Sequence, residues 1–271
     1  MTPLTDNLLV LPLRTPTLPP ATHTNCYVAG DTRLTAFDPA SPWADEQDRI
    51  ADLLDGRLER IVLTHHHHDH IGGVRALLEA CGPAPVWAHR KTAELVRDWM
   101  DVDHYLDEGD VLSCDGTDYA VFHTPGHAPG HLVFFDRGTG VMVAGDMVAG
   151  TGTIVIGPDD GDLGQYLHSL ERIRDLSPTT LLPAHGDPIR HPRALLDTYI
   201  AHRHARTEQF RQVLLQQGEA TPLDIATAVY ADEVPAEVIP LAAQQVISHL
   251  RWMVEHGLAT GPDPEGRWRS G

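Results

Sequence analysis

The chain has 271 residues, 42% of them hydrophobic, and a formal net charge of −18 with histidine counted as neutral. This length suits one sizeable domain with a small appendage, and no apolar run approaches the ~20 residues of a membrane span. Lys91 is the single lysine, so the charge disfavours nucleic acid as a partner, because phosphate backbones are bound mostly by lysine and arginine.

The start of the chain and its cysteines indicate a compartment. Residues 1–20 are rich in proline and lack the basic start and apolar stretch of a secretion signal. Cys26, Cys81 and Cys114 are odd in number and widely spaced, which is not the pattern of a disulfide framework. Both features predict a cytoplasmic location, where thiols stay reduced.

The early part of the chain predicts short strands and turns. The stretch 25–29 ends at a Gly-Asp turn and is followed by a partner stretch, 34–37, as in a β-hairpin. Asp38-Pro39 then ends the second strand, because proline cannot donate a hydrogen bond within a sheet. The Asp38 carboxylate at this tip is either a turn-capping group or a partner of a neighbouring site residue. A helix is predicted over 44–54.

A histidine-rich loop follows the short apolar segment 60–64. Its letters fit H-x-H-x-D-H, with His65, His67, Asp69 and His70 in the fixed positions. Three imidazoles and a carboxylate this close together predict a metal site. Zn²⁺ takes imidazole nitrogen and carboxylate oxygen as ligands, and Mn²⁺ or Fe²⁺ also accept them.

Other interpretations of this run of histidines exist. A purification tag or a solvated loop would also hold several histidines, but this run is internal and lies between two regular elements. In a second register, His66, His68 and His70 alternate and could be the ligands. Only the first register places Asp69 beside His70 in the H-x-H-x-D-H pattern, so we take His66 and His68 as non-ligands.

Three later strand ends also carry residues of the metal-binding type. They are His127 within the segment 123–131, Asp146 after the strand 141–144, and His185 after the strand 180–182. The segment 123–131 contains two Pro-Gly steps, which force a tight loop that can aim side chains from a rigid sheet. Each tip alone is a common polar turn, but several such tips in one chain predict a shared site.

The remaining elements follow from apolar periodicity. Helices are expected over 74–80, 91–100 and 163–176, and strands over 85–88, 111–112, 119–122, 132–135 and 153–156. His104 lies in an acidic, turn-rich stretch and is expected to be solvated.

The last part of the chain predicts a second unit. Helices are expected over 193–217, 223–230 and 235–256, followed by a hairpin over 258–268. Thr221-Pro222 supplies a cap and a first-turn proline for the second of these helices. Three helices and a hairpin resemble a winged-helix module, so we expect domains at residues 1–194 and 195–271.

Together, the strand tips resemble the metallo-β-lactamase superfamily, whose motifs correspond to Asp38, the H-x-H-x-D-H loop, His127, Asp146 and His185. The resemblance covers about residues 22–187. It implies an α/β fold: a four-layered αβ/βα sandwich of two mixed sheets, here with a small winged-helix-like helical domain appended. The chain departs from many relatives at Asp38-Pro39-Ala40, where they carry Asp-Thr-Gly, and at Ala184, where a glycine often precedes the last ligand.

The resemblance further implies two divalent metal ions, with Zn²⁺ expected and Mn²⁺ or Fe²⁺ as alternatives. The first metal would be bound by His65, His67 and His127. The second would be bound by Asp69, His70 and His185, with Asp146 bridging both. Asp69 would be the catalytic residue that orients or deprotonates a metal-bound water, while Asp38 and His131, with His123, would support the ligands.

The tail narrows the expected function. The helix containing Tyr199 to Arg203, followed by the winged-helix-like end, is similar to the β-lactamase-like-protein group. That group includes a mitochondrial endoribonuclease and thioesterases that release polyketides from carrier proteins. We expect a metal-bound hydroxide to attack a thioester, lactone or related acyl compound, either a small molecule or carrier-bound. His202 and Arg203 are expected to contact the substrate, and a homodimer is compatible with the sequence.

Three alternative functions stay open at this point. An endoribonuclease is supported by the tail and opposed by the charge. A persulfide dioxygenase would use a single iron in the same superfamily. A DNA-binding role for the winged helix is opposed by its would-be recognition helix, residues 235–256, in which Arg251 is the only lysine or arginine.

Overall fold

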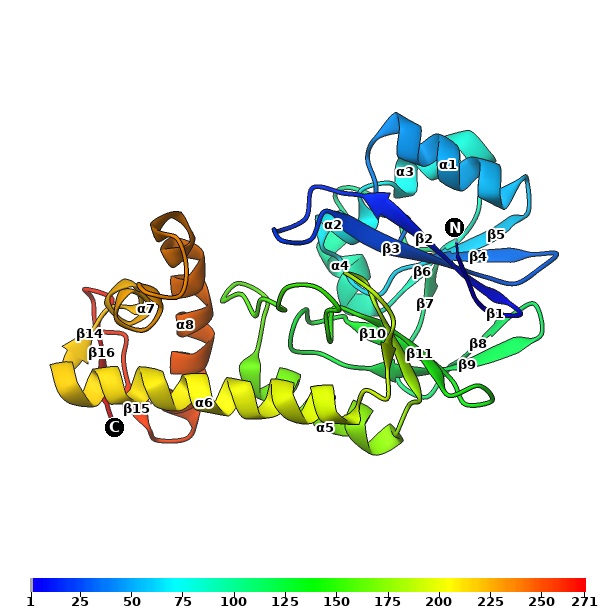
Figure 1. The fold of residues 1–271 in the computed structure, drawn as a ribbon. Coiled ribbons are helices and arrows are strands. Elements are labelled where there is room, and N and C mark those ends of the chain that lie inside the picture. Colours follow the sequence, from blue (N-terminus) through cyan, green and yellow to red (C-terminus); the bar gives the residue numbers. More distant parts are fainter. Residues whose placement is uncertain (1) are drawn as a thin grey trace.

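The computed structural model describes residues 2–271 and shows two β-sheets packed face to face with helices outside them (Figure 1). The first sheet contains, in order, β1 (Thr2–Thr5), β2 (Leu8–Arg14), β3 (His23–Ala29), β4 (Leu34–Phe37), β5 (Leu58–Val62), β6 (Val86–Ala88) and β7 (His104–Tyr105). The second contains, in order, β13 (Ile189–Arg190), β12 (Thr180–Pro183), β11 (Val141–Gly145), β10 (Leu132–Asp136), β9 (Thr117–His123) and β8 (Val111–Cys114). Both sheets are mixed, because β4 to β7 and the pair β11–β12 run parallel while β2–β3 and β9–β10 are antiparallel.

Alternate side chains of a strand pack in different layers of the fold. In β3, Tyr27 and Ala29 enter the core between the sheets, whereas Cys26 and Val28 face the outer helices, because successive side chains of a strand point to opposite faces. The helices that pack on the first sheet are α1 (Ala44–Leu54), α3 (Val74–Cys81) and α4 (Arg90–Val96), and those on the second are α5 (Leu163–Leu176) and α6 (Arg193–Gln217). The predicted α/β fold with two mixed sheets and outer helices is confirmed.

Several predicted elements have the bounds expected. The helices predicted over 44–54, 163–176 and 193–217 are confirmed at both ends. The start of α5 is fixed by Asp162, whose side chain accepts a hydrogen bond of 2.8 Å from the Gln165 backbone N–H, as expected for a capping residue. The helix predicted over 91–100 is shorter, since α4 ends at Val96.

Two predicted elements are wrong. Residues 153–156 do not form a strand, because the carbonyls of Ile154 and Ile156 accept hydrogen bonds from side chains of Arg203 and Ser248 and not from a strand partner. The single helix predicted over 235–256 is instead a 3₁₀ turn, η1 (Ala236–Val238), followed by α8 (Ile239–Glu255). Pro240 has no N–H for the Ala236 carbonyl, so a continuous α-helix cannot form there.

The last part of the chain forms its own apolar core. Its parts are α6, α7 (Pro222–Tyr230), α8 and an antiparallel sheet ordered β14 (Glu219–Ala220), β16 (Trp268–Ser270), β15 (Ala259–Thr260). α6 crosses the expected boundary, because its Leu196 lies in the core of the second sheet and its Phe210 in the C-terminal core. The winged-helix identity and the division at residue 195 stay predictions. No helix within residues 2–271 combines the length and apolar character that crossing a bilayer demands.

At Gly126, the loop between β9 and β10 lies in close contact with α5. Its φ is +131°, and a Cβ at this position would lie 2.1 Å from the Tyr166 backbone nitrogen. We expect Gly126→Ala to lower the free energy of unfolding, measured by urea denaturation, by several kcal/mol, since backbone strain of about 1–3 kcal/mol adds to the clash. Gly116→Ala is the matched control, because Gly116 has φ +95° and its Cβ would meet nothing within 4 Å. Equal losses in the two variants would contradict this packing argument.

Candidate metal centre

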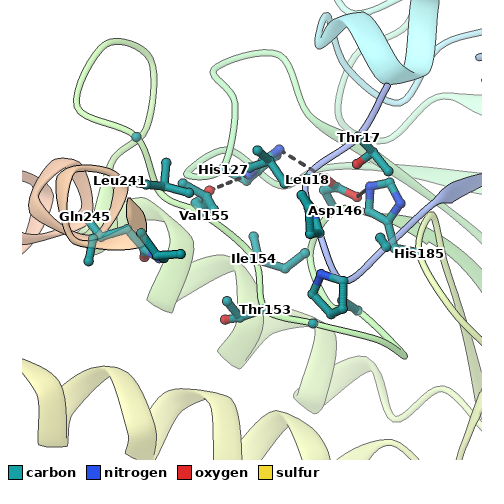
Figure 2. Close-up of a pocket in the computed structure, with 18 of the residues that line it drawn as sticks. Thr17, Leu18, His127, Asp146, Thr153, Ile154, Val155, His185, Leu241 and Gln245 are labelled. Carbon is teal, nitrogen blue, oxygen red and sulfur yellow. Dashed lines mark hydrogen bonds and ion pairs between the residues drawn. The ribbon is translucent and has the colours of Figure 1, made fainter. Parts of the chain in front are cut away.

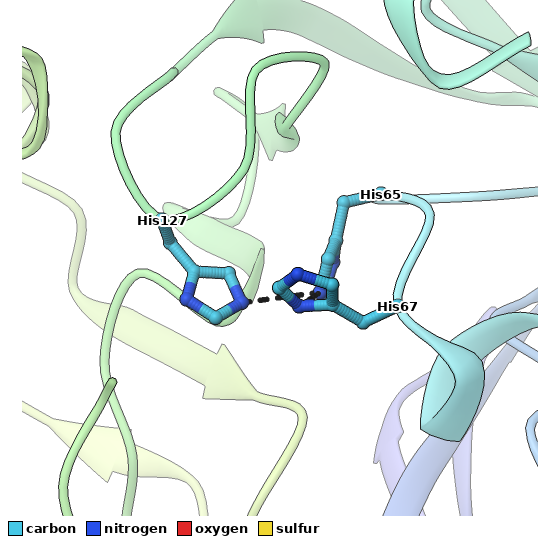
Figure 3. A group of neighbouring side chains, drawn as sticks. All are labelled: His65, His67 and His127. Carbon is cyan, nitrogen blue, oxygen red and sulfur yellow. Dashed lines mark hydrogen bonds between the residues drawn. The ribbon is translucent and has the colours of Figure 1, made fainter. Parts of the chain in front are cut away.

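The first group of ligand-type side chains joins two loops of different sheets. His65 and His67 follow β5, and His127 lies in the loop after β9 (Figure 3). His65 Nε2 is 3.0 Å from His67 Nδ1 and 3.2 Å from His127 Nε2. The three imidazoles therefore present one nitrogen each to a common point, within 4.8 Å of one another.

The second group lies beside the first. Asp69, His70 and His185 bring one ligand atom each within the same distance, and His185 Nε2 is 3.5 Å from Asp69 Oδ2. Asp146, at the end of β11, connects the groups (Figure 2). Its Oδ1 is 3.6 Å from His70 Nε2 and 3.5 Å from His185 Nε2, and its Oδ2 is 3.4 Å from His127 Nε2.

Backbone carbonyls fix the orientation of two of these rings. His127 Nδ1 donates to the Val155 carbonyl at 2.8 Å, and His185 Nδ1 donates to the His23 carbonyl at 3.0 Å. A carbonyl only accepts, so each ring carries its proton on Nδ1 and turns the lone pair of Nε2 inward. Outer hydrogen bonds of this kind orient histidine ligands in metal sites.

Two carboxylates and a hydroxyl fix the other three rings. His70 Nδ1 is 2.8 Å from Asp38 Oδ2, and His67 Nε2 is 2.8 Å from Asp160 Oδ2. Thr64 Oγ1 donates to Asp38 Oδ2 at 2.6 Å, which leaves its lone pair for His65 Nδ1 at 3.0 Å. Asp38 thus orients His70 directly and His65 through Thr64.

The inner atoms of the two groups fit divalent cations. His70 Nε2 and Asp146 Oδ1 are buried and have no hydrogen-bond partner among residues 2–271, and a buried polar atom without a partner is costly. His65 Nε2 and His127 Nε2 face each other, but neither carries a proton, because the proton of each ring lies on Nδ1. They therefore cannot form a hydrogen bond with each other. Five imidazoles and two carboxylates with converging lone pairs are the donor set of Zn²⁺, and Mn²⁺ or Fe²⁺ accept the same atoms.

Burial also sets protonation in the cluster. Burial, followed by the nearby imidazoles, lowers the pKa of His65 well below its ordinary value, and burial lowers the pKa of His127 to about 4. Burial alone would raise the pKa of Asp146, but His70 and His185 hold it well below its usual range. Burial opposes protonation of His70 and His185 as well, but the Asp146 carboxylate outweighs it and raises the pKa of both rings. Neutral imidazoles, as at His65 and His127, and an ionised carboxylate are the forms that ligate metals, so a cation bound here would displace protons from His70 and His185.

Other histidines of the sequence have different positions. His131 Nε2 accepts the Asp146 backbone N–H at 3.0 Å, so this ring holds the Asp146 backbone and belongs to neither group. His123 stacks on His89 with ring centres 4.1 Å apart, outside both groups. His66 Nε2 lies 3.0 Å from Asp160 Oδ2, and the His68 ring lies 6.4 Å from that of Trp99.

A cavity of about 710 Å³ extends from the ligands to the C-terminal helices. Figure 2 shows His127, Asp146 and His185 on one side of it and Leu241 and Gln245 of α8 on the other. His202 and Arg203 also line it. Arg203 is only 4% exposed, however, and its guanidinium donates to the Ile154 carbonyl and, at 2.8 Å, to Gln245 Oε1. Arg203 therefore has structural partners at the cavity wall.

Sequence reasoning missed Thr64, Asp160 and the carbonyls of Val155 and His23. Thr64 directly precedes the histidine motif, and this position could have indicated that it supports a ligand. Asp160 belongs to an acidic pair far along the chain, and nothing in its neighbours links it to His67. Every residue has a backbone carbonyl, so the sequence does not indicate which carbonyls accept these hydrogen bonds.

Comparison with known proteins identifies the family. The model of the "Metallo-beta-lactamase superfamily" matches residues 19–185. A "Beta-lactamase-like protein 2 homolog" of Drosophila melanogaster is 32% identical over 250 residues, which cover 86% of this chain and 83% of that protein. An "Atrochrysone carboxyl ACP thioesterase" of Claviceps purpurea is 25% identical over 228 residues, which cover 81% of this chain and 70% of that protein.

A solved structure supports the fold over almost the whole chain. The crystal structure of a beta-lactamase domain protein from Burkholderia ambifaria superposes with a TM-score of 0.88 at 20% identity, and the match covers 99% of this chain and 93% of that one. The suspected branch, with beta-lactamase-like protein 2 and lactamase-like thioesterases as relatives, is confirmed. The chain therefore belongs to the metallo-β-lactamase superfamily, as one of its hydrolases.

Proposed function

We propose that this protein hydrolyses thioesters or closely related acyl compounds with an apolar acyl group, using two divalent metal ions, zinc in the first instance. The observation that carries the proposal is the cavity, which ends at Asp69, Asp146 and His185 and has an apolar wall toward the C-terminal helices. The name of the Claviceps relative, a thioesterase for an acyl carrier protein substrate, supports the same bond type.

Metal ions at the two groups would polarise the substrate carbonyl and acidify a water. The chain assigns different tasks to its two carboxylates. Asp69 has a side chain 19% exposed and lines the cavity, so it can hold a water and accept its proton. Asp146 has a side chain 9% exposed and touches imidazoles of both groups, so it keeps the groups at a fixed separation.

The apolar wall suits an acyl chain. Apolar side chains of the cavity lining include Leu18, Ile154, Val155, Val238 and Leu241. Leu18 and Leu241 are 51% and 39% exposed, which is unfavourable in water and becomes favourable when an apolar group covers them, at roughly 25 cal/mol per Å². A hydrocarbon chain would gain this free energy on entering the cavity.

The charges at the cavity disfavour RNA. Its arginines are Arg203 and Arg206. Arg203 is held by the structure as described, and Arg206 pairs with Glu233, with Nη1 3.1 Å from Oε1. Few cationic groups are left to neutralise phosphates, which such binding requires. The complete second group around Asp69 and His70 likewise supports a two-metal hydrolase over a single-iron dioxygenase.

Asp69→Asn tests the assigned proton acceptor. We expect kcat on an acyl thioester to fall about 10²–10⁴-fold, the usual contribution of a positioned acid or base. Asp98→Asn is the control, since the Asp98 side chain is 98% exposed and belongs to neither metal group nor the cavity lining. Unchanged hydrolysis by Asp69→Asn, with thioesters, lactones, β-lactams and RNA tested in parallel, would refute the assigned role.

Leu241→Ala tests the acyl-binding wall. We expect kcat/KM for an eight-carbon acyl thioester to fall about tenfold, because up to three methylene equivalents of apolar contact are lost at ~0.8 kcal/mol each when fully buried. The acetyl thioester has only one methyl group to place against the wall, so its kcat/KM should change little. Leu223→Ala is the matched control on α7, 51% exposed and outside the cavity. Equal losses on both substrates would contradict binding of the acyl chain at this wall.

A further inference from the structure

The segment 153–160, called the strap below, lies between the metal centre and the C-terminal helices. Figure 2 shows Val155 between His127 and the α8 residues Leu241 and Gln245. The strap belongs to no helix or strand. Its carbonyls therefore lack ladder partners and must find hydrogen-bond donors elsewhere, because buried backbone groups are almost always paired.

On one side, the strap holds two imidazoles of the first metal group. The Val155 carbonyl accepts from His127 Nδ1 at 2.8 Å. Asp160 Oδ2 accepts from His67 Nε2 at 2.8 Å and lies 3.0 Å from His66 Nε2. The strap thus sets the tilt of His67 and His127, whose other nitrogens face His65.

On the other side, the strap is held by α6 and α8. The Ile154 carbonyl accepts from the Arg203 guanidinium, and the Pro158 carbonyl accepts from that of Arg251. The Ile156 carbonyl accepts from Ser248 Oγ at 2.8 Å. The carbonyls of Ile154 and Ile156 thus bond to the C-terminal unit (residues 195–271), while the Val155 carbonyl between them bonds to His127.

The side chains of the strap add a second constraint. Ile154 and Ile156 are 3% and 1% exposed and pack in the core of the second sheet. Arg203 is itself held by Gln245 and lies 5.4 Å from the centre of the Tyr166 ring. The strap is therefore fixed in three ways: two of its side chains are buried, α6 and α8 donate hydrogen bonds to its carbonyls, and it accepts hydrogen bonds from two histidines of the first metal group.

We propose that the C-terminal unit, through the strap, sets the affinity of the His65/His67/His127 group for its metal, with Arg203 and Ser248 as positioning residues. The inference rests on the proposed metal binding. Loss of one anchor frees the neighbouring peptide, the Val155 carbonyl moves, and its bond to His127 weakens because hydrogen bonds are sensitive to alignment. Loss of outer partners of metal-ligating histidines commonly changes metal affinity 10–100-fold.

Ser248→Ala in the full-length protein is the test. We expect competition with a chelator to show one of two Zn²⁺ dissociation constants raised about tenfold, and Asp160→Asn, a direct partner of His67, to raise the same constant by about 10–100-fold. The Co²⁺-substituted protein should show a matching change in its visible absorption, which a loss of stability alone would not produce. Arg251→Met, at an exposed anchor, repeats the test should Ser248→Ala fail to fold.

Thr207→Ala is the matched control. Its hydroxyl is also buried in the C-terminal unit, where it donates to the Arg203 carbonyl at 3.0 Å, but it does not contact the strap. Thr207→Ala should lower stability without changing either constant. Wild-type affinities in both Ser248→Ala and Arg251→Met, or the same change in Thr207→Ala, would overturn the coupling. A wild-type protein that binds no metal would instead overturn the proposed function itself.

Discussion

The structure depends on inward-facing lone pairs that the outer hydrogen bonds impose on five imidazoles. Carbonyls, carboxylates and one hydroxyl take the outer proton of each ring, so the inner nitrogens cannot satisfy one another. Asp146 adds a buried oxygen without a partner among residues 2–271. Such an arrangement is unfavourable unless cations occupy its centre. The sheets, the tight loops and the strap all serve to hold these groups together.

The sequence was most informative where local rules agree with the fold. The strand predicted over 25–29 lies within β3, and the helix predicted over 163–176 is α5, because turn residues and apolar periodicity act over a few residues. Residues 153–156 were predicted as a strand from their apolar pattern. Their carbonyls bond to Arg203 and Ser248, far along the chain, and no local pattern carries that information.

The site follows the same division. The H-x-H-x-D-H loop is contiguous, so the residue types alone indicate its chemistry. A site shared with His127, Asp146 and His185 was expected from their places at strand ends, while the assignment of each residue to one of two metals came from a family resemblance. Thr64, Asp160 and the Val155 carbonyl act on ligands through contacts that appear only after folding. Arg203 was expected to contact the substrate, and this stays a prediction: it lines the cavity, and the fold also gives it structural partners that the sequence did not indicate.

The most direct measurement is diffraction at a metal absorption edge from crystals of the full-length protein, combined with elemental analysis of the same preparation. We expect two divalent ions per chain, one contacting His65, His67 and His127 and the other contacting Asp69, His70 and His185, with Asp146 between them. Protein that retains no ion after equilibration with zinc, or ions bound elsewhere while these side chains keep their positions, would contradict the account.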